Sequence, residues 1–400
     1  MMEALKADMR QVLEENILQY WMERMVDEEH GGFYGRRDGE DHLIKDAPKG
    51  AVLNARILWT FSAAYRVLSK PAYLDMALRA KEYILNHFID YEYGGVYWML
   101  DFKGNPIDCR KQIYAIGFMI YGFSELYRAT GDEKALKTAI QLFNDIERHA
   151  YDSQNNGYIE ALTREWQPIG DMRLSDKDEN GSRTMNTHLH ILEPYTNLYR
   201  VWKDKELEQQ LRNLIHIFVT KIVNAHSSHL DLFFDDHWMG ARDIVSYGHD
   251  IEAAWLLTEA LEILGDEQLI SEIMPIVNRI AQAAEEGIQP CGAMLDERRV
   301  GESMSPPLKG QGGDFVWWVQ CECIIGELNQ WQHFGDNEAL ARALRCWEYT
   351  KQHLIDWEHG EWYWSILENG KINLDDDKAG PWKCPYHNTR MCIEVMERIG

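Results

Sequence analysis

Gly31-Gly32-Phe33-Tyr34 is the first of six short stretches in which a turn is joined to aromatic or aliphatic residues. The other five are Gly94-Gly95-Val96-Tyr97-Trp98, Asn156-Gly157-Tyr158, Leu230-Asp231-Leu232-Phe233, Gly292-Ala293-Met294-Leu295 and Gly360-Glu361-Trp362-Tyr363-Trp364. Each is typical of a tight β-hairpin. They recur roughly every 60 to 75 residues along the chain, and such a period indicates one supersecondary unit that is reused.

A short polar turn recurs in phase with the hairpins and leads into a second helical stretch. It reads Ser69-Lys70-Pro71, Gly131-Asp132-Glu133, Lys203-Asp204-Lys205, Gly265-Asp266-Glu267 and Gly335-Asp336-Asn337. Two helical stretches therefore lie between consecutive hairpins. Six such helical pairs, closed on themselves, predict an all-α fold: a barrel of six inner and six outer helices with short β-hairpins in the loops and one central cavity.

The more apolar helix of each pair is expected to belong to the inner ring. These stretches are 52–67, 113–129, 186–201, 249–264, 316–332 and 386–399. The outer helices are amphipathic, as in 73–88, where apolar residues alternate with charged ones at helical spacing. The repeat is not interrupted by a linker or a low-complexity tract, so we expect residues 1–400 to form one domain.

The charge of the chain excludes several classes of partner. The formal net charge is −24, which repels phosphate backbones and anionic membranes, and no stretch reaches membrane-spanning length. The seven cysteines are odd in number and form no CxxC pair, a pattern typical of free thiols in a reducing compartment. The N-terminal residues lack an apolar signal region. We expect a soluble cytoplasmic monomer that binds neither nucleic acid nor membranes.

Two insertions interrupt the repeat. Residues 171–184 precede the third inner helix and residues 298–313 precede the fifth, and both are rich in glycine or charge. Because both lie at the end of the barrel where inner helices begin, we expect them to form a lid or wall over the cavity.

The inner helices carry polar or aromatic residues near their beginnings, where a barrel core would place aliphatic ones. They are Arg56, Tyr114, His190, His249, Trp318 together with Glu322, and His387. Three are histidines, whose unperturbed pKa lies close to neutral pH and which act as acids or bases. A ring of helices would gather these side chains in its central cavity.

The stretch Met185-Asn186-Thr187-His188-Leu189-His190 opens the third inner helix. Residues two apart on a helix point about 200° apart, so only one of the two histidines can face the cavity. Asn186 and His190 are four apart and share a face. We therefore assign His190 to the cavity, and interpret His188 as a hydrogen-bonded structural histidine.

The fourth inner helix opens with Gly248-His249-Asp250-Ile251-Glu252. Glu252 lies one turn after His249, so its carboxylate can orient the imidazole, raise its pKa or hold a ligand hydroxyl. The structural alternative is that this stretch merely caps the helix. Gly248 favours the functional interpretation, because it permits another group to approach the start of the helix.

Three further residues stand out. Arg56 is a cation inside an apolar helix, and it requires a charged partner or a task such as stabilising oxyanion charge. Trp382 occupies a loop, where it needs to be covered by protein or ligand. Trp318 has Glu322 one turn later, whereas the adjacent Trp317 is better interpreted as part of the core.

Other kinds of site lack support in the sequence. The histidines do not have HxxxH or HExxH spacing, so we expect no metal. Neither GxGxxG after a strand nor a GKS/T loop occurs, so we expect no nucleotide cofactor.

Four segments resemble those of the cellobiose 2-epimerases, within the N-acylglucosamine 2-epimerase superfamily. They are MNTHLHILEPYTNLYRVW, SYGHDIEAAWLL, WWVQCE and WKCPYHNTR, and the resemblance covers essentially the whole chain. It implies an (α/α)6 barrel and a cofactor-free intracellular enzyme. It also implies that the substrate is a β-1,4-linked disaccharide whose reducing-end glucose is interconverted with mannose.

The resemblance also implies roles for individual residues. The family's acid/base histidines correspond to His249 and His387, its third site histidine to His190 and its arginine to Arg56. Its sugar-contacting residues correspond to Tyr114, Asn186, Glu252, Trp255, Trp318, Glu322 and Trp382. Two histidines on facing helices, with pKa values near working pH, would exchange a proton at C2 through a cis-enediolate.

Two other classes of protein remain as alternatives. Many α/α barrels hydrolyse glycans with two carboxylates, and Glu252 and Glu322 are candidates for that pair. A sister enzyme, an N-acylglucosamine 2-epimerase or a mannose isomerase, would use the same fold. A non-enzymatic sugar-binding module would leave the buried arginine and the histidines without a task.

Overall fold

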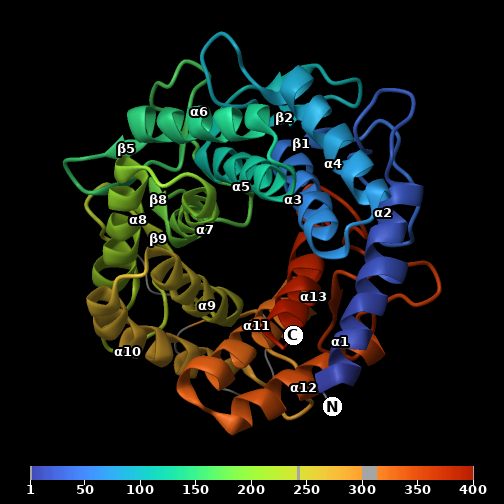
Figure 1. Cartoon of the computed structure of the whole chain (residues 1–400), viewed down its shortest axis with the longest axis vertical. Helices are drawn as coiled ribbons and strands as arrows, with labels where there is room; N and C mark the ends of the chain where they lie inside the picture. The colour runs from blue at the N-terminus through green and yellow to red at the C-terminus, as the bar shows by residue number, and fades with distance from the viewer. Residues whose placement is uncertain (1, 241–243, 300–312, 400) are drawn as a thin grey trace.

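The computed structural model describes residues 2–240, 244–299 and 313–399. Within these residues, six helices form a closed inner ring in which each helix packs against the next and the last packs against the first (Figure 1). In chain order they are α3 (Ala51–Leu68), α5 (Ile113–Thr130), α7 (Met185–Val201), α9 (Tyr247–Leu264), α11 (Trp317–Phe334) and α13 (Tyr386–Arg398). The predicted inner helices are confirmed, and each begins within about two residues of its expected start.

An outer layer of helices surrounds this ring (Figure 1). The first outer helix is α1 (Met2–Gln11), which continues through a π-helical segment (Val12–Leu18) into α2 (Gln19–Arg24). The other five are α4 (Pro71–Tyr83), α6 (Glu133–His149), α8 (Lys205–Ile217), α10 (Glu267–Ala284) and α12 (Asn337–His353). Helices α4 and α8 end in π-helical segments (Ile84–Phe88 and Phe218–Ile222), and α10 ends in a 3₁₀ turn (Glu285–Gly287). Each of α4, α6, α8, α10 and α12 packs on the inner helix that precedes it, and α1 packs on α13. The predicted barrel of paired inner and outer helices is therefore confirmed.

The polar turns explain why an inner helix ends where it does. Gly131, Gly265 and Gly335 adopt left-handed φ angles of 72°, 68° and 68° directly after α5, α9 and α11. Glycine pays no Cβ penalty there, so it stops a helix efficiently. The next residue is an aspartate whose carboxylate accepts hydrogen bonds from backbone N–H groups of the following outer helix. A left-handed stop followed by an N-cap thus reverses the chain.

Burial separates the two layers. Every residue of α3 from Ala51 to Ala64 is buried, whereas α6 buries only one stripe that includes Ala135, Phe143 and Ile146. This is the pattern expected for a helix enclosed on all sides and for a helix that covers it. Although the inner helices are apolar, no helix in the described part of the chain is long and apolar enough to cross a membrane.

The predicted hairpins are present as short antiparallel pairs. Five of the six hairpins contain a single β-bridge. The third hairpin along the chain has two short strands, β5 (Tyr151–Asp152) and β6 (Gly157–Tyr158). The bridges are Val26–Phe33, Ile89–Val96, Val223–Leu230, Ile288–Met294 and Ile355–Trp362. Each joins the chain that leaves an outer helix to the chain that approaches the next inner helix.

A second set of strand pairs links neighbouring repeats. The residues just before an inner helix pair with residues that follow the next hairpin. The pairs are β1 (Lys49–Gly50) with β2 (Met99–Leu100), which also pairs with β3 (Pro106–Asp108); β4 (Lys111–Gln112) with β7 (Ala161–Leu162); β8 (Arg183–Thr184) with β9 (Phe233–Phe234); β10 (Ile244–Ser246) with β11 (Glu297–Arg299); and β12 (Phe315–Val316) with β13 (Ser365–Ile366). These pairs fix the starts of the inner helices relative to one another.

Helix α7 is kinked where it passes closest to α5. Pro194 lacks an N–H, so it leaves the carbonyl of His190 without its helical donor, and His190 has a non-helical ψ of 15°. That carbonyl lies against Gly117 of α5, where an added Cβ would be 2.3 Å from the oxygen. Only glycine permits this contact, so Gly117 and Pro194 together set the position of His190.

We expect Gly117→Ala to destabilise the protein by about 1–3 kcal/mol, because the new methyl group overpacks the contact with the His190 carbonyl. The loss should appear although alanine ordinarily favours a helix over glycine by about 1 kcal/mol. Chemical denaturation measures it. Gly170→Ala is the matched control, since nothing lies within 4 Å of the Cβ it would add. Equal stability of the two variants would contradict a tight α5–α7 contact.

Candidate active site

A cavity of about 460 Å³ opens at the end of the barrel where the inner helices begin. Its wall includes the starts of α7, α9 and α11, where it is lined by the predicted residues Asn186, His249 and Trp318. Residues 173–175 and 177–179 of the first insertion form another part of this wall, as expected. Of the second insertion, residues 298 and 299 belong to β11, while 300–312 lie outside the described residues.

The remaining predicted residues lie deeper in the barrel. Five of them are each no more than 5% exposed: Arg56, His190, Glu252, Glu322 and His387. They come from α3, α7, α9, α11 and α13, so five of the inner helices converge on one buried polar centre. A group that reached it from the cavity would be shielded from bulk water.

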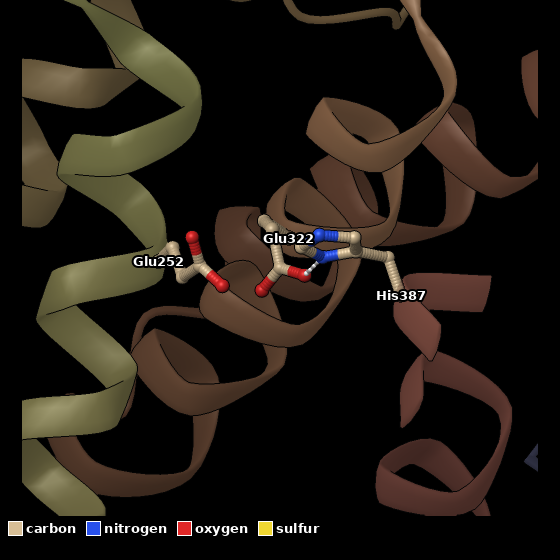
Figure 2. A group of neighbouring side chains, drawn as sticks. All are labelled: Glu252, Glu322 and His387. Carbon is tan, nitrogen blue, oxygen red and sulfur yellow. Dashed lines mark hydrogen bonds and ion pairs between the residues drawn. The ribbon is translucent and has the colours of Figure 1, made fainter. Parts of the chain in front are cut away.

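His387 is held by a carboxylate of the neighbouring helix. Its Nδ1 lies 2.7 Å from Glu322 Oε1, and Figure 2 shows the imidazole and this carboxylate pointing toward each other. The other oxygen of Glu322 accepts a hydrogen bond of 2.9 Å from Trp255 Nε1. A carboxylate acceptor keeps the proton of the neutral imidazole on Nδ1, which leaves Nε2 as a base.

His190 has an equivalent partner that the sequence analysis did not identify. Its Nδ1 lies 2.9 Å from Glu193 Oε2, three residues later on α7. The rings of Tyr114 and Phe118 pack on the same imidazole at centroid distances of 5.0 and 4.9 Å. His190 is therefore fixed both by a hydrogen bond and by aromatic contacts.

Of the three roles open to Glu252, the structure does not show the one in which it orients His249. The Nδ1 of His249 lies 2.8 Å from Ser246 Oγ, while Glu252 accepts a hydrogen bond of 2.5 Å from Arg390. Ser246 is the N-cap residue of α9, and its hydroxyl bonds the imidazole instead of a backbone N–H. Gly248 does permit a close approach, as predicted: the approaching group is Trp318, 2.6 Å from the position of an added Cβ.

Trp318 lies between the two proposed acid/base histidines. Its ring centroid is 4.8 Å from that of His249 and 5.6 Å from that of His387. Helices α9 and α13 are both neighbours of α11 in the ring, so the two histidines come from helices on either side of Trp318. The expectation that their helices face each other across the barrel is therefore wrong.

Arg56 and Arg390 are both buried but have opposite surroundings. Arg390 donates to carboxylates of Glu193, Glu252 and Glu322. Arg56 donates to Tyr114 Oη at 2.9 Å and lies over the ring of Phe118 at 4.2 Å. Among the described residues, Arg56 forms no ion pair with a carboxylate.

Burial changes the protonation of the histidines. It lowers the pKa of His249 to about 3, and the nearby His190 adds to this effect. Burial, with the charges of Arg56 and Arg390, lowers the pKa of His387 well below its ordinary value. The pKa of His190 is also lowered by burial, although Glu193 opposes the shift. The expectation of pKa values near neutral pH is wrong, because desolvation disfavours each imidazolium.

Aromatic rings line the approach to the buried centre. Trp382 packs edge-to-face on Tyr114, with ring centroids 5.9 Å apart. Its ring centroid is 6.2 Å from that of Trp98. It lines a second hollow that shares Asn186 and Trp364 with the main cavity. Trp98 comes from the second hairpin and Trp364 from the sixth, and the sequence analysis assigned neither to the site.

Two residues take the structural roles predicted for them. His188 lies between the carbonyl of Thr184 and the backbone N–H of Tyr158, at 2.7 and 3.0 Å, and is fully buried. Trp317 is 3% exposed and packs on Trp364. Both therefore support the hairpins and do not line the cavity.

One group of side chains has donors that suit a metal ion. Ligand atoms of Glu252, Glu322 and His387 lie within 4.8 Å of one another (Figure 2). Arg390 already donates to both carboxylates, at 2.5 and 2.7 Å, so a cation is present at this position. The donor set fits a divalent ion poorly while the guanidinium remains there, and the absence of a metal stays a prediction.

Known proteins resemble this chain over nearly its whole length. The family model of N-acylglucosamine 2-epimerase (GlcNAc 2-epimerase) matches residues 31–390. Cellobiose 2-epimerase of Bacteroides fragilis is 58% identical over 394 residues, covering 98% of this chain and 99% of that protein. Cellobiose 2-epimerase of Ruminococcus albus is 40% identical and covers 98% of both chains.

A solved structure agrees with this relationship. Cellobiose 2-epimerase from Bacillus thermoamylovorans B4167 superimposes with a TM-score of 0.92 at 41% identity, covering 99% of this chain and 100% of that one. The ring of paired helices, the buried histidines and these matches lead to the same conclusion: the chain belongs to the N-acylglucosamine 2-epimerase family.

Proposed function

We propose that this protein is a cellobiose 2-epimerase, which reversibly converts the reducing-end glucose of β-1,4-linked disaccharides such as cellobiose and lactose into mannose. The observation that carries the proposal is the buried centre, where two histidines flank Trp318 and where Arg56 lies nearby with no carboxylate partner among the described residues. The 58% identity to a cellobiose 2-epimerase supports this substrate class over that of the sister enzymes. We further propose that residues 1–400 act as one catalytic domain.

The reaction requires the sugar ring to open. A C–H bond beside an alcohol is scarcely acidic, but opening the ring exposes the C1 aldehyde and places the C2 proton beside a carbonyl. A base removes this proton to give a cis-enediolate, and protonation from the other face gives the epimer. No net oxidation occurs, so the reaction needs no nicotinamide.

His249 and His387 are proposed to exchange the C2 proton, with His190 assisting ring opening or holding O1. Each turnover removes a proton on one face and returns one on the other, so one histidine must be neutral and the other protonated. The two imidazoles have different partners: Nδ1 of His387 contacts the carboxylate of Glu322, whereas Nδ1 of His249 contacts the hydroxyl of Ser246. The charge of a bound enediolate would raise the pKa of both imidazoles.

Arg56 is proposed to stabilise the enediolate. Its guanidinium is surrounded by the hydroxyl of Tyr114 and by aromatic faces, so its charge is not already neutralised by a carboxylate. In a site shielded from water, such a preorganised charge is worth far more than in solution. Helix α3 lies opposite α9 in the ring, which places Arg56 across the barrel from His249.

The second sugar is proposed to stack on the aromatic residues of the approach. An indole face complements the apolar C–H face of a pyranose, and Trp382 with Trp98 forms such a surface. Asn186 is available to bind a sugar hydroxyl, because its buried Oδ1 has no hydrogen-bond partner within residues 2–240, 244–299 and 313–399. Tyr114, Glu252, Trp255, Trp318 and Glu322 complete the proposed substrate-binding set.

The glycoside hydrolase alternative is not favoured. A hydrolase needs two carboxylates that act separately, one as an acid and one as a base or nucleophile. Glu252 and Glu322 both accept from the same nitrogen of Arg390, at 2.5 and 2.7 Å. They are therefore held together by one cation at the bottom of the site.

Incubation with cellobiose in D₂O containing EDTA should yield 4-O-β-glucosyl-mannose that carries deuterium at C2, because the mechanism exchanges this proton and needs no metal. NMR of the products measures both. Release of glucose would support a hydrolase, and turnover restricted to N-acetylglucosamine or free mannose would indicate a sister enzyme. Activity that EDTA abolishes and a divalent ion restores would contradict metal independence.

His249→Ala and His387→Ala should each lower turnover by about 10²–10⁴-fold, the usual contribution of a positioned acid or base. Both side chains border the site, so the variants should remain folded by circular dichroism. His226→Ala removes an exposed histidine of the fourth hairpin and should match the wild type. Wild-type turnover in either test variant would contradict the two-histidine mechanism.

Trp382→Ala should lower kcat/KM for cellobiose by about 2- to 13-fold, equivalent to 0.5–1.5 kcal/mol for one aromatic contact. The loss for free glucose or mannose should be much smaller if the indole contacts the non-reducing ring. Trp357→Ala, which removes an exposed tryptophan of the sixth hairpin, is the control. Equal losses on disaccharide and monosaccharide, with a lower Tm, would assign Trp382 to structure.

A further inference from the structure

Arg390 connects the histidines of the site through their carboxylate partners. It lies one turn after His387 on α13, and its side chain is 1% exposed. One terminal nitrogen donates to Glu193 and to the hydroxyl of Tyr386; the other donates to Glu252 and Glu322 at 2.5 and 2.7 Å. Its guanidinium also lies over the ring of Trp255, 4.8 Å from the centroid.

Two of these carboxylates also bind histidines. Oε1 of Glu322 accepts from Arg390 and lies 2.7 Å from His387 Nδ1. Glu193 accepts from Arg390 through Oε1 and contacts His190 Nδ1 through Oε2. A single guanidinium is therefore one hydrogen-bonded group away from two histidines on different helices.

The charges at this centre require such a cation. Glu193, Glu252 and Glu322 are all at most 1% exposed, and three ionised carboxylates so close together would repel one another strongly. Burial and the charge of Glu322 raise the pKa of Glu252 well above its ordinary value. Burial raises the pKa of Glu193, but the charge of Arg390 and the contacts with His190 and Tyr386 together lower it below its ordinary value.

We propose that Arg390 is a positioning residue that fixes the orientation of the Glu193 and Glu322 carboxylates, so that His190 and His387 both carry their neutral-state proton on Nδ1 and offer Nε2 to the substrate. The proposal rests on the proposed function for the use of these histidines, but the tautomers themselves can be observed without substrate. Lysine cannot replace this function fully, because an ammonium lacks the planar fork that reaches three carboxylates.

The test compares Arg390→Met and Arg390→Lys with Arg398→Met. Arg398 lies on the same helix and pairs with Glu394, away from the histidines, so its loss removes a partly buried arginine without altering their partners. Protein labelled with ¹⁵N at histidine reports the tautomer and the titration of each ring by NMR, and signals are assigned from the single histidine variants. Cellobiose turnover and the folded fraction are measured on the same samples.

In the wild type and in Arg398→Met, His190 and His387 should show the Nδ1–H tautomer. Arg390→Met should populate the other tautomer of His387 or of His190 and lower turnover about 10²-fold, as expected for misplaced reacting groups. Arg390→Lys should lose less and retain the wild-type tautomers. The titration of His387 should move to higher pH in Arg390→Met, because the arginine charge lowers this pKa.

Other groups facing His387 limit the size of that pKa shift: Arg56 on α3, His190 and Glu193 on α7, Glu252 on α9 and Glu322 on α11. Unchanged tautomers and titration in a folded Arg390→Met protein would overturn the proposal, as would an activity loss that only follows the unfolded fraction. If the wild type does not epimerise cellobiose, the proposed function fails, whereas the tautomer result still decides the role of Arg390.

Discussion

The burial of positive charge inside the helix ring is the constraint on which this site depends. An ion taken from water into a protein interior loses several kcal/mol of solvation, and only closely arranged counter-charges compensate it. Arg390 obtains this compensation from α7, α9 and α11 while it belongs to α13. The packing of four of the six inner helices is therefore coupled to one ion-pair network.

Arg56 illustrates the opposite solution. Its contacts are a phenol hydroxyl, the sulfur of Cys384 and three aromatic faces, which stabilise a cation without neutralising it. The positive charge of Arg390 is thus compensated by carboxylates, whereas the positive charge of Arg56 is not. In the proposed reaction the negative charge of the intermediate would be stabilised by Arg56, because the charge of Arg390 is already paired with three carboxylates.

Much of the fold could be predicted from the sequence because its signals are local. The hairpin glycines and the left-handed residues such as Gly131 and Gly265 act within a few residues of themselves, and so does the aspartate N-cap that follows each of them. Each signal is weak by itself, but the same pattern recurs in six repeats, which makes the predicted fold more specific. The position of the kink at His190 was not predicted, because it depends on Pro194 and on Gly117 of another helix.

The site was predicted less completely, because its contacts depend on the tertiary structure. The residues near the helix starts converge as expected, since a closed ring gathers them, but hydrogen-bond partners depend on how each helix is rotated. Glu252 therefore faces Arg390 and not His249. Glu193 and Arg390 each follow a site histidine by three residues, a spacing that would have indicated them. Trp98, which is 284 positions from Trp382, has no such local signal.

Closure of the ring affects when the site is completed during synthesis and folding. Helix α13 carries both His387 and Arg390, and a ribosome makes it after the other five inner helices. The sixth hairpin is joined to the first helical segment through Trp21 with Glu361 and through Asn16 with Asp356, pairs that are 340 residues apart. Contacts so distant in sequence form late in folding. Until α13 is in place, Glu193, Glu252 and Glu322 lack Arg390, and Glu322 also lacks His387, so the proposed reaction depends on the inner helix that is made last.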